Sequence, residues 1–306
     1  MSNTSIIEVK KLVKKFGQFA ALDGLDLSVK PGEVHGFLGP NGSGKSTTIR
    51  VLLGILRKTS GQATVLGQDP WNDAVELHRR LAYVPGEVGL WPNLTGGELI
   101  DLLCTLRGGT IDTKRRDQLT ERFQLDVRKK FGTYSKGNRQ KVALVAALAS
   151  DVELYIMDEP TSGLDPLMES VFQETIMELK GRGKTILLSS HILAEVEKLC
   201  DRVTIIREGR TVESGTLAEL RHLHRTTIKA EIENSPAGLK KLKGIHELKV
   251  DGKNIEFEVD SKDLDGALEQ LAKLNVRALM SHPPTLEELF LRHYDEAPAR
   301  DKKAVD

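Results

Sequence analysis

The chain has 306 residues, enough for one large domain with a small one, and its 44 basic and 44 acidic residues cancel, which does not favour a DNA or RNA clamp. The two cysteines lie far apart without metal-binding spacing, and the longest apolar run, 142–149, is far shorter than the roughly 20 residues of a membrane helix. We therefore expect a soluble protein of the reducing cytoplasm, without a signal peptide and without a nucleic-acid partner.

The N-terminal region predicts short strands. Segments 6–9 and 25–29, together with 33–38, alternate in short bursts and predict a small antiparallel sheet, with a Pro-Gly turn before its last strand. Segment 61–67 predicts another short strand pair, and 81–85 a strand that leads into a loop.

A glycine-rich loop follows segment 33–38, and it fits the pattern G-x-x-x-x-G-K-[ST] at every required position. Its residues are Gly39, Pro40, Asn41, Gly42, Ser43, Gly44, Lys45, Ser46 and Thr47. Glycines let several backbone N–H groups converge on phosphates, while Lys45 reaches the outer phosphates and Ser46 binds magnesium. The alternative is a glycine-rich turn with a chance lysine. Because a buried strand precedes the loop and an amphipathic helix follows it, we predict a site for a nucleoside triphosphate.

The middle of the chain predicts a layered α/β fold. Residues 95–150 are helical in composition, and 153–157 is a buried strand. Asp165 can cap the next helix, which has a proline at its first position. The unalternating segments 185–188 and 203–206 are typical of parallel strands covered on both faces.

Two acids, Asp158 and Glu159, directly follow the predicted strand at 153–157. At the carboxyl end of a parallel strand beside a phosphate loop, Asp158 can hold the magnesium shell and Glu159 can orient an attacking water. A solvated acidic turn is the alternative. Because attack on a γ-phosphate depends on positioning and charge neutralisation, the pair predicts hydrolysis.

The pattern changes beyond about residue 225. Alternating segments predict strands at 226–232, 247–250, 255–259 and 276–280, with helices at 236–242 and from 264 to 274. The order βαββαβ predicts a small ferredoxin-like α+β domain over 226–295. The tail 296–306 is polar enough to be disordered.

The first part of the chain, roughly 5–220, resembles the ATP-binding subunit of ABC transporters, because five elements stand in that family's order. Between the phosphate loop and the acids, Tyr134-Ser135-Lys136-Gly137-Asn138 is similar to the signature LSGGQ, with Ser135 and Gly137 matching. The signature opens a helix, whose N-terminus presents N–H groups to an anion. In the family it touches the γ-phosphate of the opposite subunit, which implies a head-to-tail dimer with two ATP molecules between the copies.

The resemblance gives roles to further residues. Segment 162–165 matches the loop that joins the two sites, His191 matches a switch histidine on the γ-phosphate, and Phe16 stands where an aromatic stacks on adenine. In isolation His191 would be an ordinary loop residue and Phe16 a core side chain. Where the family has a magnesium-binding glutamine this chain has Gly86. We expect the neighbouring Glu87 to replace it as a metal ligand, unless the loop simply tolerates the change.

The resemblance implies a P-loop NTPase domain of ABC type over 5–225, with an antiparallel β subdomain and a helical insertion at about 95–150. It implies an ATPase that uses ATP and Mg²⁺ and drives a separate integral membrane permease from the inner face of the cell membrane. The ending 282–290 is similar to exporters of the daunorubicin and tetronasin resistance type, which implies export of a drug, antibiotic or other hydrophobic compound. The alternatives are a soluble ABC ATPase acting on ribosomes or DNA, and a nucleotide-binding regulator without useful turnover.

Overall fold

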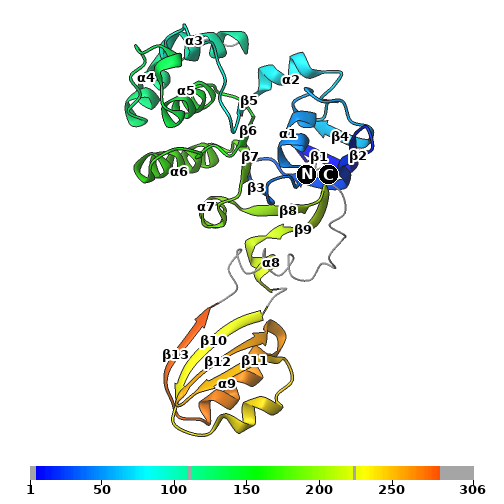
Figure 1. The fold of residues 1–306 in the computed structure, drawn as a ribbon, viewed down its shortest axis with the longest axis vertical. Coiled ribbons are helices and arrows are strands. Elements are labelled where there is room, and N and C mark those ends of the chain that lie inside the picture. The colour runs from blue at the N-terminus through cyan, green and yellow to red at the C-terminus, as the bar shows by residue number, and fades with distance from the viewer. Residues whose placement is uncertain (1–4, 109–111, 223–224, 283–306) are drawn as a thin grey trace, which may run out of the picture. The chain divides into compact units, whose positions relative to one another are not determined.

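The computed structural model describes residues 5–108, 112–222 and 225–282 (Figure 1). The chain forms two compact units, residues 1–214 and 215–306, which divide within a strand, whereas the sequence placed the domain boundary between 225 and 226. The predicted tail, 296–306, lies outside the described residues.

The first unit contains two sheets and a set of helices. Its strands are β1 (Ile7–Phe16), β2 (Phe19–Val29), β3 (Val34–Leu38), β4 (Ser60–Val65), β5 (Leu81–Val84), β6 (Leu154–Asp158), β7 (Thr185–Ser190), β8 (Arg202–Arg207) and β9 (Arg210–Thr216). Its helices are α1 (Lys45–Leu52), α2 (Ala74–Arg80), α3 (Gly96–Leu106), α4 (Thr113–Arg122), α5 (Lys136–Leu148), α6 (Pro166–Gly181) and α7 (Leu193–Leu199), with a 3-10 turn η1 (Phe131–Thr133).

The central sheet has six strands in the order β5-β6-β7-β3-β8-β9, and its pairs from β5 to β8 are parallel. Every residue of β3, β6 and β7 is buried, as expected for parallel strands covered on both faces. The prediction that segment 33–38 joins the antiparallel sheet was wrong. A strand buried on both faces belongs in the middle of a parallel sheet, and β3 pairs there with β7 and β8.

The antiparallel sheet has the order β2-β1-β4. The predicted strand pair at 61–67 is instead one strand, because β4 pairs with β1 from Ser60 to Val65 and the chain turns back only at the bridge from Val65 to Gln68. Apolar side chains of this sheet pack with α1 and with residues of β6 in one hydrophobic core. This core packs the middle and end of α1 against both sheets.

The helical insertion begins at a capping box. Thr95 Oγ1 accepts a hydrogen bond from the Glu98 N–H at 3.2 Å, and Glu98 Oε2 accepts one from the Thr95 N–H at 2.7 Å. In α5, every residue from Gln140 to Leu148 is buried, because the helix packs against α3, α4 and β5. The predicted cap of α6 is confirmed, since Asp165 Oδ1 accepts from the Met168 N–H at 3.0 Å.

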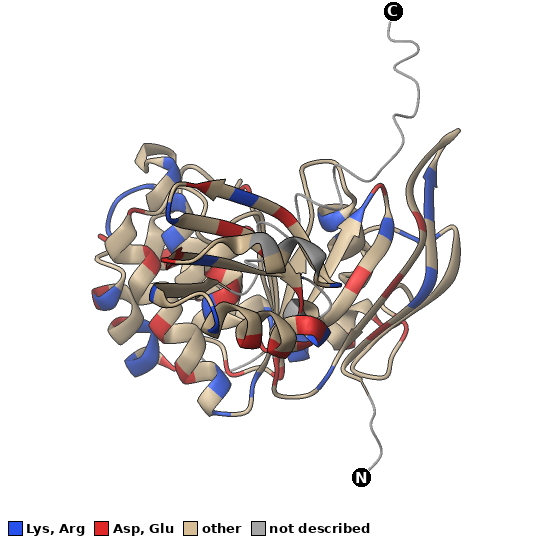
Figure 2. Ribbon diagram, turned by 90° about the horizontal axis from the view of Figure 1, so that it is seen from below, with Lys and Arg blue, Asp and Glu red and all other residues tan. Residues whose placement is uncertain are grey.

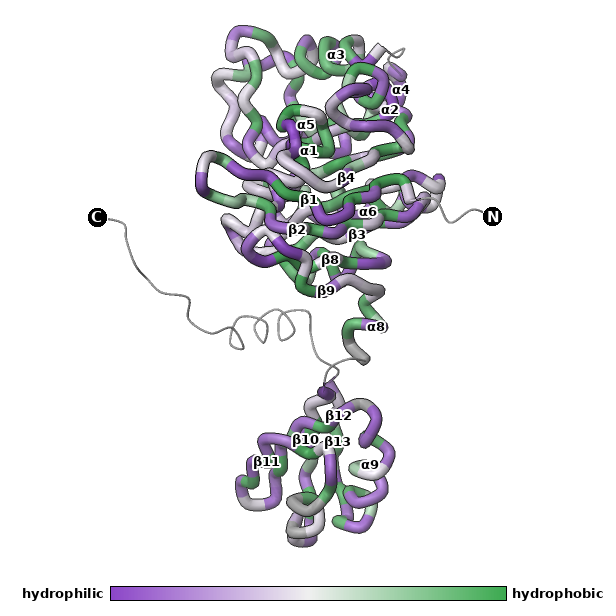
Figure 3. The backbone as a smooth tube through the Cα atoms, turned by 90° about the vertical axis from the view of Figure 1, so that its right-hand side faces the viewer, coloured by the Kyte–Doolittle hydropathy of each residue, from purple (hydrophilic) through white to green (hydrophobic). Residues whose placement is uncertain are grey.

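The second unit contains α8 (Leu217–His222), β10 (Arg225–Ile232), η2 (Pro236–Lys241), β11 (Ile245–Asp251), β12 (Asn254–Asp260), η3 (Ser261–Asp263), α9 (Leu264–Ala272) and β13 (Val276–His282). The sheet order is β11-β12-β10-β13, and all pairs are antiparallel. Because β12 lies between β10 and β11, this is the split βαβ arrangement of the predicted ferredoxin-like fold, with its first helix reduced to a 3-10 turn. Burial alternates along β10 and β12, whose mixed hydropathy is visible in Figure 3.

Charged residues are interspersed over the helices and strands, as Figure 2 shows. Among the helices that the structure describes, none combines the length and the apolar character that a bilayer crossing requires. In the first unit, the parallel strand β3 ends at the glycine-rich loop. The candidate site lies at this end of the sheet.

Candidate functional site

The glycine-rich loop joins the end of β3 to the start of α1. Gly44 has φ of 109°, a conformation that favours glycine, and a Cβ at this position would lie 2.7 Å from Leu22 Cδ2. A Cβ at Gly39 would lie 2.5 Å from the carbonyl oxygen of Ile206. The loop therefore needs glycine both for its backbone path and for its packing on the neighbouring strands.

Lys45 points back into this loop. Its side chain is 5% exposed, and Nζ donates to the carbonyl oxygens of Gly39 at 2.6 Å and of Pro40 at 3.2 Å. Burial lowers the pKa of Lys45, although the negative charges of Glu159 and Asp158 act in the opposite direction. A bound phosphate would add a further anionic partner to the two carbonyl oxygens and to the Glu159 carboxylate 3.8 Å away.

Two hydroxyls of the loop also fit a bound phosphate with its metal. Ser43 Oγ is buried and has no hydrogen-bond partner in the part of the chain that the structure describes, so a phosphate oxygen would satisfy it. Ser46, the predicted magnesium ligand, is exposed. The loop thus offers an unsatisfied group, a cation and an accessible hydroxyl to a triphosphate.

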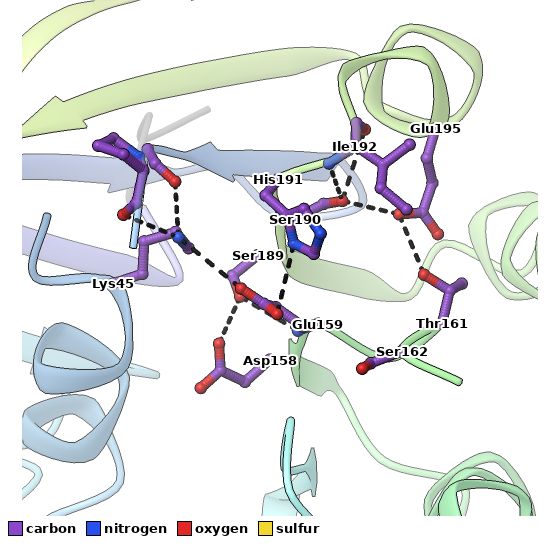
Figure 4. Close-up of polar contacts among 12 residues, drawn as sticks. Lys45, Asp158, Glu159, Thr161, Ser162, Ser189, Ser190, His191, Ile192 and Glu195 are labelled. Carbon is purple, nitrogen blue, oxygen red and sulfur yellow. Dashed lines mark hydrogen bonds and ion pairs between the residues drawn. The ribbon is translucent and has the colours of Figure 1, made fainter. Parts of the chain in front are cut away.

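Figure 4 shows how the acids at the end of β6 face this loop. Ser189 Oγ, on the adjacent strand, donates to Asp158 Oδ1 at 2.5 Å. Glu159 lies 3.8 Å from Lys45 Nζ through Oε1 and 3.4 Å from His191 Nδ1 through Oε2. Its φ of 48° is uncommon for a residue with a side chain, and such strained positions concentrate at functional sites. The structure thereby brings four predicted site residues, Lys45, Asp158, Glu159 and His191, together from three segments of the chain.

His191 and Phe16 are both accessible. The His191 side chain is 56% exposed and lies in a turn in which the Ile192 N–H donates to Ser190 Oγ at 3.0 Å. Phe16 is 48% exposed, with Lys14 Nζ 4.9 Å from its ring centroid, so the alternative of a core side chain is wrong. An exposed ring is available for stacking.

The signature segment contacts the loop 162–165 of its own chain. Ser135 caps α5, because its Oγ accepts from the Asn138 N–H at 3.3 Å. Lys136 Nζ donates to Ser162 Oγ at 2.9 Å, and a Cβ at Gly137 would lie 2.4 Å from the carbonyl oxygen of Gly163. A movement of the signature segment would therefore displace the loop 162–165, and the reverse also holds.

The loop after β5 lies beside the acids. A Cβ at Gly86 would be 3.1 Å from the carbonyl oxygen of Asp158, so Gly86 packs directly behind that residue. Glu87 is exposed and lines a cavity of about 500 Å³ with residues of the signature helix, including Lys136 and Arg139. Gln140 Nε2 donates to the carbonyl oxygen of Pro85 at 3.3 Å, which ties this loop to α5.

Sequence reasoning missed several residues of the site, namely Gln140, Ser189, Ser190 and Glu195. Gln140 and Ser189 have partners far away in the sequence, whereas Ser190 bonds Glu195 five residues ahead, and Glu195 in turn reaches the distant Thr161. Ser189 meets Asp158 because β7 pairs with β6, and a sequence does not state which parallel strands are neighbours. The two serines that directly precede His191 were the available signal.

Comparisons with known proteins agree with this geometry. Residues 22–162 match the family model described as ABC transporter, and residues 215–294 match the C-terminal domain of the DrrA1-3-like ATP-binding proteins. The chain is 37% identical over 235 residues to the bacitracin transport ATP-binding protein BcrA of Bacillus licheniformis, covering 76% of both chains. It is 38% identical over 225 residues to the daunorubicin resistance ATP-binding protein DrrA3 of Streptomyces coeruleorubidus, covering 72% of this chain and 71% of that protein.

A solved structure gives the same result for the first unit. The dimeric structure of a post-hydrolysis state of the ATP-binding cassette MJ0796, bound to ADP and Pi, is 25% identical with a TM-score of 0.63, covering 69% of this chain and 98% of that one. The predicted fold class is confirmed. The phosphate loop, the acids that face it and these matches show that the chain belongs to the ATP-binding subunits of ABC transporters and is an ATPase.

Proposed function

We propose that this ATPase, with Mg²⁺, powers a separate integral membrane permease that exports an antibiotic, drug or other hydrophobic compound. The observation that carries the hydrolytic part is the convergence of Lys45 and His191 on the two carboxylate oxygens of Glu159. The DrrA-like second unit and the relatives named for bacitracin transport and daunorubicin resistance support export. They favour this function over a role on ribosomes or DNA.

Each residue of the site has one role in ATP binding or hydrolysis. The loop N–H groups and Lys45 bind the phosphates, and Phe16 stacks on the adenine. Glu159 orients the attacking water, and His191 holds the γ-phosphate. The second carboxylate oxygen of Glu159 keeps His191 close to the same phosphate, so the attacking water and the γ-phosphate that it attacks are aligned together, and ADP leaves when the bond to the β-phosphate breaks.

The residues proposed to hold the metal are Ser46, Asp158 and Glu87. Magnesium would neutralise charge on the phosphate oxygens when bound. The hydrogen bond from Ser189 orients Asp158 for this role. Glu87 belongs to the set because Gly86 packs behind Asp158, which places their loop beside the site.

Two copies are proposed to act head to tail. Ser135 and Gly137 would then face the ATP held by the other copy, with the N-terminus of α5 directed at its γ-phosphate. The dimeric structure of the related MJ0796 cassette supports this arrangement. The permease would hold the dimer at the cytoplasmic face of the membrane.

The test is Glu159→Gln, which removes the charge needed to orient water and keeps the shape of the side chain. With ATP the variant is expected to elute as a stable dimer in gel filtration and to hydrolyse at least 100-fold more slowly than wild type. Glu76→Gln, at an exposed glutamate of α2, is the matched control and should change neither property. Coupling to a permease is tested by co-expression with a membrane protein encoded next to this chain, if one is present; its co-purification and a stimulation of hydrolysis are expected. A monomeric Glu159→Gln variant, or co-purification with ribosomes or DNA in place of a membrane protein, would contradict the proposal.

A further inference from the structure

Glu195 is a buried acid that the mechanism above does not use. It lies in α7, and the residue is 6% exposed. Its Oε2 accepts a hydrogen bond from Ser190 Oγ at 2.8 Å and a longer one from Thr161 Oγ1 at 3.5 Å. Its Oε1 is buried and has no hydrogen-bond partner within the described ranges. An acid placed this way is costly to bury, so packing alone does not explain it.

The two hydroxyls that meet at Glu195 belong to two different segments of the site, the turn that carries His191 and the segment that follows Glu159 (Figure 4). Ser190 directly precedes His191. The Ser190 hydroxyl oxygen accepts the Ile192 N–H at 3.0 Å, and the hydroxyl donates to Glu195 Oε2 at 2.8 Å. The turn that carries His191 is therefore held both by a bond within the turn and by a bond to α7. Without Glu195 the Ser190 hydroxyl would keep only the carbonyl oxygen of Ile192 as an acceptor, at 3.4 Å, and the turn would be held less firmly.

Thr161 connects Glu195 to the segment that follows Glu159. It stands two residues after Glu159, and its carbonyl oxygen accepts the Leu164 N–H at 3.0 Å, which shapes the loop 162–165. That loop contacts the signature through Ser162 and Lys136 at 2.9 Å. Glu195 Oε2 thus links the turn that carries His191 to the loop 162–165, which contacts the signature segment.

We propose that Glu195 is a positioning residue for hydrolysis: through Ser190 it orients His191 toward Glu159, and through Thr161 it holds the loop 162–165 in register with that histidine. The inference rests on the proposed hydrolytic function and adds a residue to it. Glu195 touches no substrate; it acts on the reaction through the two hydroxyls.

The neutral form of the acid is sufficient for this role, because both hydroxyls use Oε2 as an acceptor. Burial raises the pKa of Glu195 on balance; the hydrogen bonds from Ser190 and Thr161 and the charge of His191 act in the opposite direction, and the negative charge of Glu169 in α6 adds to the rise. A glutamine has the same shape and keeps the same acceptor. Glu195→Gln should therefore preserve the hydrogen bonds, whereas Glu195→Leu removes them at similar volume.

The experiment measures kcat and KM for ATP in the full-length protein. Glu195→Leu is expected to lower kcat about tenfold or more while KM changes less than twofold, since one well-placed hydrogen bond to a catalytic turn corresponds to about that factor. Glu195→Gln should restore kcat to within about threefold of wild type. Ser190→Ala, which removes the hydroxyl and keeps the backbone, should reproduce the loss even where Glu195→Leu folds poorly.

A double-mutant cycle separates positioning from general stability. In a His191→Ala background, Glu195→Leu should give a clearly smaller loss than in the wild type, because the part of its effect that passes through the histidine is already gone and only the part through Thr161 remains. Val196→Ala, at a fully buried neighbour in α7, is the control; it should lower the melting temperature and leave kcat within twofold of wild type.

Additive losses in the cycle, equal losses in Val196→Ala, or unchanged kcat in both Glu195→Leu and Ser190→Ala would each overturn the role of Glu195 while hydrolysis by the wild type stands. Absence of hydrolysis by the wild type would instead refute the proposed function, and this inference with it.

Discussion

Gly137→Ala tests whether the contact between the signature and the loop 162–165 matters for hydrolysis. Gly137 lies in α5, where alanine is the better helix former by up to about 1 kcal/mol, so local propensity alone would make the substitution neutral or stabilising. Packing points the other way. The new Cβ would lie 2.4 Å from the carbonyl oxygen of Gly163, about 1 Å inside ordinary van der Waals contact.

No side-chain rotation can relieve this overlap, because the Gly163 oxygen is a backbone atom and the position of the new Cβ is fixed by the backbone of α5. The loop and the start of α5 must separate by roughly 1 Å, and displacements of that size in a catalytic arrangement can lower turnover about 100-fold. Lys45 and the phosphate loop are untouched. We therefore expect kcat to fall about 100-fold while the affinity of the single chain for ATP stays within twofold.

The assay combines steady-state ATP hydrolysis with titration of a fluorescent ATP analogue. Gly181→Ala is the control, since it makes the same chemical change at the last residue of α6, where a Cβ would meet no atom within 4 Å. A Gly137→Ala protein that turns over at the wild-type rate, or a Gly181→Ala protein with the same loss, would refute the reasoning.

Four further substitutions address single steps. Lys45→Ala should abolish the rise in melting temperature that ATP causes in the wild type, because the buried ammonium is the phosphate's cation; a retained shift in thermal unfolding would argue against that role. Ser189→Ala should raise the Mg²⁺ concentration for half-maximal hydrolysis about tenfold, since it removes the 2.5 Å hydrogen bond to Asp158, and an unchanged Mg²⁺ titration would contradict this. Phe16→Ala should weaken ATP binding about tenfold in a calorimetric titration, in line with the loss of one base–aromatic stack, whereas triphosphate alone should bind equally well to both proteins. Glu87→Ala should reduce transport by the reconstituted complex with nearly unchanged nucleotide affinity, and normal transport would show that the loop tolerates the change.

The motifs were readable in the sequence because their chemistry depends on residues that are neighbours in the chain. The spacing of Gly39, Gly44 and Lys45 reflects a single loop that must bend around an anion. Asp165 marks the start of α6 because its side chain accepts a hydrogen bond from the backbone N–H three residues ahead. Alternation along 226–232 likewise predicted β10, because one face of that strand is buried. Local backbone geometry and periodic burial leave direct traces in a sequence.

The pairing of distant segments left no such trace. The segment 33–38 carried a buried pattern, yet only the tertiary structure placed it as β3 between β7 and β8 rather than in the antiparallel sheet. The same parallel register carries Ser189 to Asp158. Glu195 joins Ser190 to Thr161 by packing across helices and loops. The sequence by itself determined the kind of chemistry and predicted the residues proposed to touch ATP. The tertiary structure decided which side chains lie against those residues, because most of these contacts arise from long-range packing that no spacing along the chain encodes.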